Sequence, residues 1–203
     1  MAGTSLQRLA GISDGIFAVS MTLLVLGLAV PLSISHPTEG ELWNELMNLG
    51  SNVLIYTLSF MTLGIFWVGQ STQMSQLVRS NRHYAWLMLT FLFAVTLLPF
   101  STGVLAHFPN LRVALVEYWL NIVLLGFMLL AAFEYGLRAH LFDESQQGQV
   151  ARLFRGRVLI AQALYAFATA LSILFPTWVS IMLIVLVQLN YVVAPRIPIL
   201  HRF

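Results

Sequence analysis

The chain contains no cysteine and no lysine, and charged residues make up only 9% of its 203 positions. The absence of cysteine excludes disulfides, thiolate nucleophiles and cysteine-ligated metals. So few charges could not cover the surface of a water-soluble domain. The ten basic residues are all arginines at the ends of apolar runs, which favours a role in membrane topology over nucleic-acid binding.

Apolar sequence is abundant instead: hydrophobic residues make up 59% of the chain, and the mean hydropathy is +0.83. Runs of about 18 or more apolar residues recur, and lipid leaves helices as the favoured spanning structure. We therefore predict an all-α membrane protein with a single six-helix transmembrane domain over residues 1–203. The expected spans are about Leu6–Val30, Leu42–Thr72, Tyr84–Ala106, Leu111–His140, Leu153–Phe175 and Thr177–Ala194.

The arginines predict an orientation for these spans. Arg112 falls on one side of a six-span arrangement, and the other nine fall on the opposite side. The positive-inside rule then places both termini in the cytoplasm, with membrane lipids as partners. The nine are Arg8, Arg79, Arg82, Arg138, Arg152, Arg155, Arg157, Arg196 and Arg202.

The first span has two different faces. At 100° per residue, one stripe holds mostly aliphatic side chains, with Thr22 at its edge, while Asp14 lies on nearly the opposite side. Such a stripe usually packs against a neighbour or faces lipid, and less often lines a pore. Its members are Ile12, Gly15, Val19, Leu23, Leu26 and Val30.

Asp14 needs a partner, because a carboxylate inside a span costs at least about 2.5–3.5 kcal/mol on insertion scales. Ser13 and Ser20 lie between Asp14 and the stripe and extend the polar face. Two interpretations stay open: a structural pin between helices, or a proton relay or ion ligand. Candidate neighbours are Trp67 and Gln70 on the second span and Asn81, Arg82 and His83 at the start of the third.

The stretch RLAGISDGIFAVSMTLLVL resembles the first helix of the endolysosomal-type potassium channel family, transmembrane protein 175, in its bacterial branch. That family is marked by R-x-x-x-F-S-D followed by G-x-F-A-x-x-x-T-L-L-V-L, and Arg8, Ser13 and Asp14 match it. Ile12 departs from the motif, which has Phe there. The segment FLFAVTLLPFST (Phe91–Thr102) also resembles the third helix of the family.

The resemblance implies a homotetramer in a bacterial inner membrane, in which four copies of the first helix surround a central pore. It implies that Val19, Leu23 and Leu26 form the narrowest part, with Thr22 as a hydroxyl layer that K⁺ contacts transiently. The expected function is leak-type conduction of K⁺ in preference to Na⁺, without a cofactor or resident metal. The family commonly has Trp and then a His pair on its second helix, whereas this chain has Trp67 followed by Gln70 and Ser71.

The sequence was also compared with the features of enzymes, transporters and membrane scaffolds. The five histidines lie scattered at loop edges, and no G-x-S-x-G, H-E-x-x-H or P-loop motif occurs, so no enzyme is expected. The alternative is a proton- or cation-coupled secondary transporter using Asp14, although no internal repeat supports it. A membrane scaffold without transport is a third possibility. Glu134 is expected to pair with Arg138 at i+4.

Overall fold

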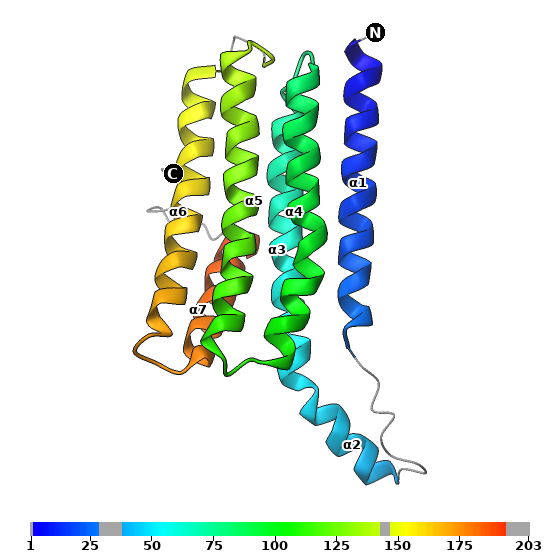
Figure 1. Ribbon diagram of the computed structural model, residues 1–203, viewed down its shortest axis with the longest axis vertical. Coiled ribbons are helices and arrows are strands. Elements are labelled where there is room, and N and C mark those ends of the chain that lie inside the picture. Colours follow the sequence, from blue (N-terminus) through cyan, green and yellow to red (C-terminus); the bar gives the residue numbers. More distant parts are fainter. Residues whose placement is uncertain (1, 29–37, 143–146, 194–203) are drawn as a thin grey trace.

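The computed structural model describes residues 2–28, 38–142 and 147–193, and the predicted all-α class is confirmed within these residues. Most of the helices stand side by side in an upright bundle, whereas α2 leans away from its lower end (Figure 1). The helices are α1 (Ala2–Leu26), α2 (Glu39–Asn48), α3 (Gly50–Ser75), α4 (Arg82–His107), α5 (Arg112–Arg138), α6 (Gln147–Leu171) and α7 (Thr177–Val193).

The single helix expected over 42–72 is divided into α2 and α3 at Leu49. A capping box starts α2, in which the Thr38 backbone N–H donates to Glu41 Oε2 at 2.8 Å and the Glu41 N–H donates to Thr38 Oγ1 at 3.3 Å. Asn48 and Gly50, poor helix formers, flank the break. None of the residues of α2 is buried, so α2 projects beyond the bundle rather than extending α3.

Within the part of the chain that the structure describes, four helices are long and apolar enough to cross a membrane: residues Leu6–Leu26 of α1, and α3, α4 and α5. In α7, the apolar stretch Thr177–Tyr191 is shorter than these four. The first half of α6 carries three arginines, which leaves it less apolar. Six crossings per subunit therefore stay a prediction, whereas an integral membrane protein follows from the four apolar helices.

Buried hydroxyl and amide groups tie the middle of the bundle together. Tyr118 on α5 lies 3.2 Å from Ser59 Oγ and 3.1 Å from Thr62 Oγ1, both on α3. Thr102 on α4 donates to Ser59 at 2.8 Å, and Gln188 on α7 donates to Thr62 at 2.6 Å. Such bonds stabilise helix association where lipid removes the hydrophobic driving force. This network holds α3, α4, α5 and α7 as one frame beside α1.

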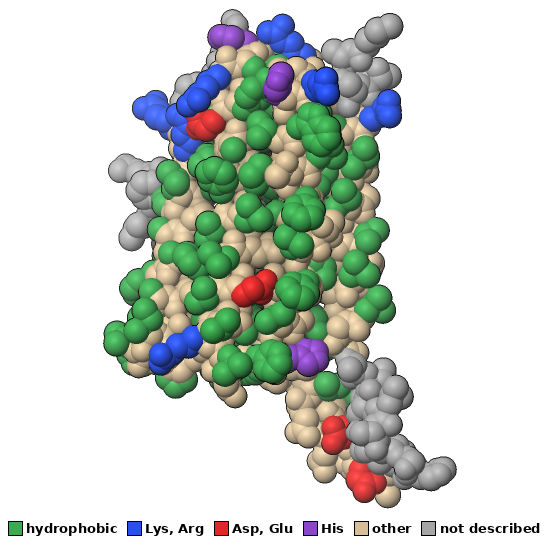
Figure 2. Space-filling model, in the orientation of Figure 1, with side chains coloured by type: hydrophobic (Ala, Val, Ile, Leu, Met, Phe, Trp, Pro, Cys, Tyr) green, Lys and Arg blue, Asp and Glu red, His purple; other side chains and the backbone are tan. Residues whose placement is uncertain are grey.

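Most charged side chains lie toward the two ends of the bundle. Most of the visible arginines and histidines gather at the end where α1 begins, and acidic side chains of α2 lie at the other (Figure 2). The pairing expected for Glu134 is corrected: its carboxylate accepts from Arg155 on α6, with Nη2 at 2.7 Å from Oε2, rather than from Arg138. Arg155 donates to both carboxylate oxygens of Glu134 through Nε and Nη2, which is the bidentate geometry of strong charge-assisted hydrogen bonds.

Candidate pore-lining helix

One face of α1 docks onto the bundle. Its buried residues are spaced four, four, three and four apart, which keeps them on a single stripe of a helix. Among the described helices, α1 contacts α3 and α4. Phe17 is 1% exposed, and its ring centroid lies 6.0 Å from that of Phe91 on α4. The docking stripe consists of Leu9, Ser13, Phe17, Ser20 and Leu24.

Two side-chain hydrogen bonds join α1 to α3 near the N-terminal half of α1. Trp67 Nε1 donates to Asp14 Oδ1 at 2.9 Å, and Gln70 Nε2 donates to Ser13 Oγ at 3.1 Å. Ser13 in turn donates to the Leu9 carbonyl at 3.0 Å. Trp67 and Gln70 lie three residues apart on α3 and therefore present both donors to the same side. The structure thus brings together Ser13, Asp14, Trp67 and Gln70.

Other expected neighbours of Asp14 lie elsewhere. Asn81 caps α4 by accepting from the Tyr84 N–H at 2.9 Å, and it donates to the Tyr135 hydroxyl at 2.9 Å. The ring of His83 also contacts Tyr135, at 6.2 Å between centroids. The Arg8 side chain is exposed, and within 2–28, 38–142 and 147–193 no hydrogen bond or ion pair of it is found.

The aliphatic stripe of α1 is uncovered in the single subunit. Val19 is 56% exposed, Leu23 45% and Leu26 75%. Ile12, on the same stripe, is 47% exposed. Because the buried stripe faces α3 and α4, these side chains point away from their own bundle. Val30 of the predicted stripe lies outside the described residues.

Thr22 is exposed between the turns that carry Val19 and Leu26. Its hydroxyl proton is committed, because Oγ1 donates to the Val19 carbonyl at 2.8 Å. A hydroxyl oxygen has two lone pairs besides its proton. Thr22 can therefore offer oxygen lone pairs outward, toward a cation, while it competes little as a donor.

A cavity of about 900 Å³ adjoins the other flank of α1. Asp14 and Trp67 lie on its wall together with Arg157 and Tyr191, and most of the remaining lining is apolar. Its residues come from α1, α3, α5, α6 and α7. The cavity places the Asp14 carboxylate beside open space, which the sequence did not indicate. Among the described residues, no group of three or more His, Cys, Asp or Glu side chains could hold a metal.

Sequence reasoning identified the exposed stripe and the polar contacts but missed the apolar part of the docking face. Phe17, Ser20 and Leu24 continue the spacing of Leu9 and Ser13 at intervals of three and four. That periodicity is visible in the sequence, but it competes with an almost equally apolar stripe on the exposed side. A helix that is apolar nearly all round does not show which side packs.

The sequence of this chain is similar to those of known potassium channels. A family model described as endosomal/lysosomal potassium channel TMEM175 matches residues 8–99, a range that includes the whole Arg8 to Asp14 motif. A potassium channel of Streptomyces collinus is 30% identical over 170 residues, which are 81% of this chain and 81% of that protein. A potassium channel of Chamaesiphon minutus is 33% identical over 114 residues, 55% of this chain and 56% of that protein.

The fold is also shared. The crystal structure of a lysosomal potassium-selective channel TMEM175 homolog from Chamaesiphon minutus matches with a TM-score of 0.78 at 23% identity, over 94% of this chain and 98% of that one. The family is one of channels, which is not an enzyme class. With 30% identity over 81% of both chains, and with the family motif on α1, the chain belongs to the TMEM175 family.

Proposed function

We propose that this protein is a potassium-permeable cation channel that conducts K⁺ in preference to Na⁺ as a homotetramer. The observation that carries the proposal is the two-sided α1: one stripe docks on α3 and α4, and a separate aliphatic stripe is exposed. The relatives named as potassium channels support the choice of ion.

In this proposal, four copies of α1 surround a symmetry axis and present rings of identical residues. Val19, Leu23 and Leu26 form aliphatic rings, and Thr22 adds a ring of hydroxyl oxygens. The exposure of these side chains in the subunit is compatible with that arrangement. Docking of the other face through Phe17 leaves the stripe free to meet its symmetry mates.

The selectivity follows from the absence of ligands in an aliphatic ring. A narrow apolar constriction offers an ion no replacement for its water, and it can also close by dewetting. K⁺ holds its hydration shell less tightly than Na⁺, so the same constriction opposes Na⁺ more. The outward lone pairs of Thr22 return part of the lost coordination to a passing K⁺.

Leu26→Ala tests the proposal. Vesicles containing the purified protein are loaded with either KCl or NaCl and diluted into the salt of an impermeant cation. K⁺ or Na⁺ is then the sole permeant cation, and flux is followed with a potential-sensitive dye. We expect Leu26→Ala to raise Na⁺ flux several-fold relative to K⁺ flux, because four isobutyl groups leave the narrowest ring.

Val25→Ala is the matched control, since Val25 is 60% exposed and adjacent in sequence but lies about 100° around the helix, toward the Asp14 flank. It should leave both fluxes within about twofold of the parent, because it lies off the proposed pore. Equal effects of the two substitutions, or no effect of either, would contradict a pore lined by the aliphatic stripe.

We also propose that both termini lie in the cytoplasm of a bacterial cell and that membrane lipids surround the tetramer. The support is the gathering of arginines at the end where α1 begins, opposite the acidic α2 (Figure 2). Protease protection in sealed inverted membrane vesicles tests this orientation. Cleavage of a tag placed before α1 is expected only when the cytoplasmic face is outside.

The second candidate is a proton- or cation-coupled transporter that uses Asp14. The observation in its favour is the cavity of about 900 Å³, on whose wall Asp14 lies. The two functions differ in their kinetics. Flux that saturates with substrate and requires a coupling ion supports a transporter, whereas flux that rises linearly with driving force supports the channel.

A further inference from the structure

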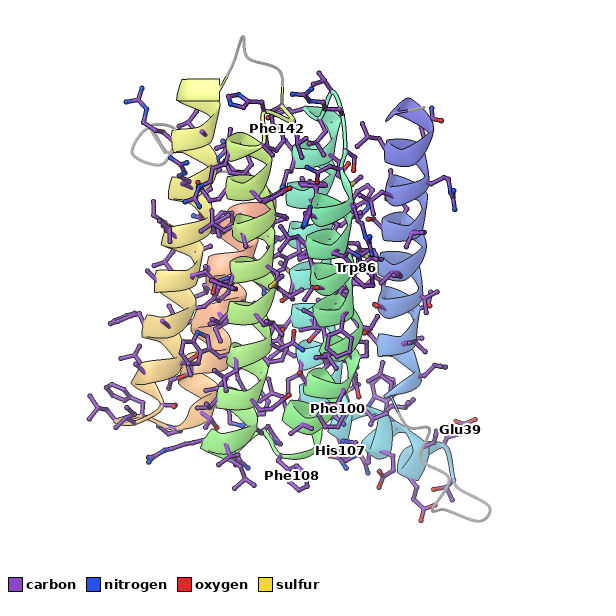
Figure 3. The ribbon with its side chains drawn as sticks, turned by 45° about the horizontal axis from the view of Figure 1, so that its top comes forward. Glu39, Trp86, Phe100, His107, Phe108 and Phe142 are labelled. Carbon is purple, nitrogen blue, oxygen red and sulfur yellow. The ribbon has the colours of Figure 1, made fainter. Side chains whose placement is uncertain are left out.

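A second polar site lies between α4 and α5, away from α1. Ser101 Oγ donates to Glu117 Oε1 at 2.8 Å, and Asn121 Nδ2 donates to Ser101 Oγ at 3.0 Å. Glu117 and Asn121 are four residues apart on α5 and share one face. Phe100 and His107, labelled in Figure 3, bracket Ser101 along α4.

This site has more acceptors than donors. Glu117 Oε2 and Asn121 Oδ1 have no hydrogen-bond partner among the described residues, and neither atom has appreciable accessible surface. The Asn121 side chain as a whole is 7% exposed. The Ser101 proton already serves Glu117 Oε1, so it cannot satisfy the second oxygen. Buried polar atoms in folded proteins nearly always have partners, so two unpartnered acceptors on neighbouring side chains favour a donor or a cation between them.

The charge of Glu117 is also unmatched. The ion pair found between the described side chains is Arg155 with Glu134, at the other end of α5. Arg112 precedes Glu117 by five residues, which places the two about 140° apart around the helix. An intramembrane carboxylate normally has a partner. Glu117 is half-buried, and its Oε2 has no appreciable accessible surface in the subunit.

We propose that Glu117, Asn121 and Ser101 bind a monovalent cation, Na⁺ or K⁺, between α4 and α5 of each subunit. The ligands are a carboxylate, an amide oxygen and a hydroxyl oxygen, which suit hard cations. One negative charge balances one positive charge. Among the described residues, no group of three or more His, Cys, Asp or Glu side chains could hold a metal ion, which favours a monovalent over a divalent cation. The site is separate from the proposed pore, since none of its residues lies on α1.

Thermal unfolding of the detergent-solubilised protein tests this site. The melting temperature is measured in NaCl, KCl and choline chloride at equal concentration, with choline as a cation too large to enter. For the parent chain we expect a melting temperature about 3–5 °C higher in NaCl or KCl than in choline, if the salt exceeds the dissociation constant about tenfold. Glu117→Gln should abolish the difference, because it removes the charge but keeps the size and an oxygen.

Three further variants separate this site from other causes. Asn121→Leu removes the orphan oxygen without touching the carboxylate and should reduce the difference, which keeps the test usable if Glu117→Gln does not fold. Glu134→Gln lowers stability through the lost Arg155 contact but should keep the salt difference. Thr22→Val, a substitution on the proposed pore, should also keep the difference in melting temperature between the salts. Equal melting of the parent in all three salts, or a full difference in Glu117→Gln, overturns the proposed cation site and leaves the channel proposal untouched.

Discussion

The hydrogen bond from Trp67 Nε1 to Asp14 Oδ1, 2.9 Å long, supports a quantitative prediction about how α1 is held. In Trp67→Phe the indole donor is lost and the carboxylate is left without it. Interhelical hydrogen bonds in membranes contribute about 0.6 kcal/mol on average and about 1.7 kcal/mol at most. An ionised acceptor at this distance belongs in the upper part of that range. We expect Trp67→Phe to lower the free energy of unfolding by about 1–2 kcal/mol.

The same substitution should matter much less once the acceptor is absent. Asp14→Ala removes an expensive intramembrane charge together with the bond, so its own net effect is small. In the Asp14→Ala background, Trp67→Phe should therefore cost less than about 0.5 kcal/mol. The coupling energy is then about 1 kcal/mol, roughly a fivefold change in the equilibrium constant.

Reversible unfolding in mixed micelles measures the free energies of this double-mutant cycle. Far-ultraviolet circular dichroism follows the unfolding without depending on tryptophan emission. Trp86→Phe is the control, because Trp86, labelled in Figure 3, is 60% exposed, and its side chain makes no hydrogen bond to the described residues. It should cost less than about 0.5 kcal/mol in either background. The same cost for Trp67→Phe with and without Asp14 would refute the idea that the two side chains clamp α1 to α3.

Two other predictions concern the frame and the projecting helix. Tyr118→Phe removes the hydroxyl that Ser59 and Thr62 share at the centre of the bundle, and should lower the free energy of unfolding by about 1–2 kcal/mol in the same micelle assay. Hydrogen bonds from the Thr38 backbone and side chain hold the pKa of Glu41 below its ordinary value. These bonds therefore stabilise the start of α2 at pH values above the unfolded-state pKa of Glu41, and the stabilisation is lost as the pH falls through the folded-state pKa. After correction for intrinsic exchange rates, the Thr38 amide should therefore be less protected from hydrogen exchange at about pH 3 than at pH 6. Glu41→Gln should weaken that pH dependence. Protection that does not change with pH in the parent chain would contradict the capping argument.

The sequence by itself was sufficient to predict an all-α membrane protein and the polar contacts of α1 with α3. Runs of apolar residues with few charges can form little other than membrane helices, because lipid leaves backbone groups no other partners. Asp14 required a partner for the same reason, and the short set of polar residues on neighbouring spans already contained Trp67 and Gln70. These inferences rest on local rules that depend on the solvent, not on the arrangement of helices.

Other features depended on contacts between segments far apart in the chain. Glu134 had a suitable arginine four residues away, yet its partner Arg155 comes from α6. The contact between Glu117 on α5 and Ser101 on α4 arises only from the packing of these two helices. The division of α2 from α3 was likewise missed, since apolar residues on both sides of Leu49 suggested one span.

The sequence alone determined that α1 is a membrane helix with a carboxylate that needs a donor, because the cost of burying charge in lipid is set by the residue and its depth. Only the tertiary structure decided which of two similarly apolar stripes packs and which stays exposed. That choice is made by Phe17 fitting against Phe91 and by two donors on α3 meeting Ser13 and Asp14. Shape and hydrogen-bond geometry between helices are not properties of either segment alone, and they leave Val19, Leu23 and Leu26 facing outward.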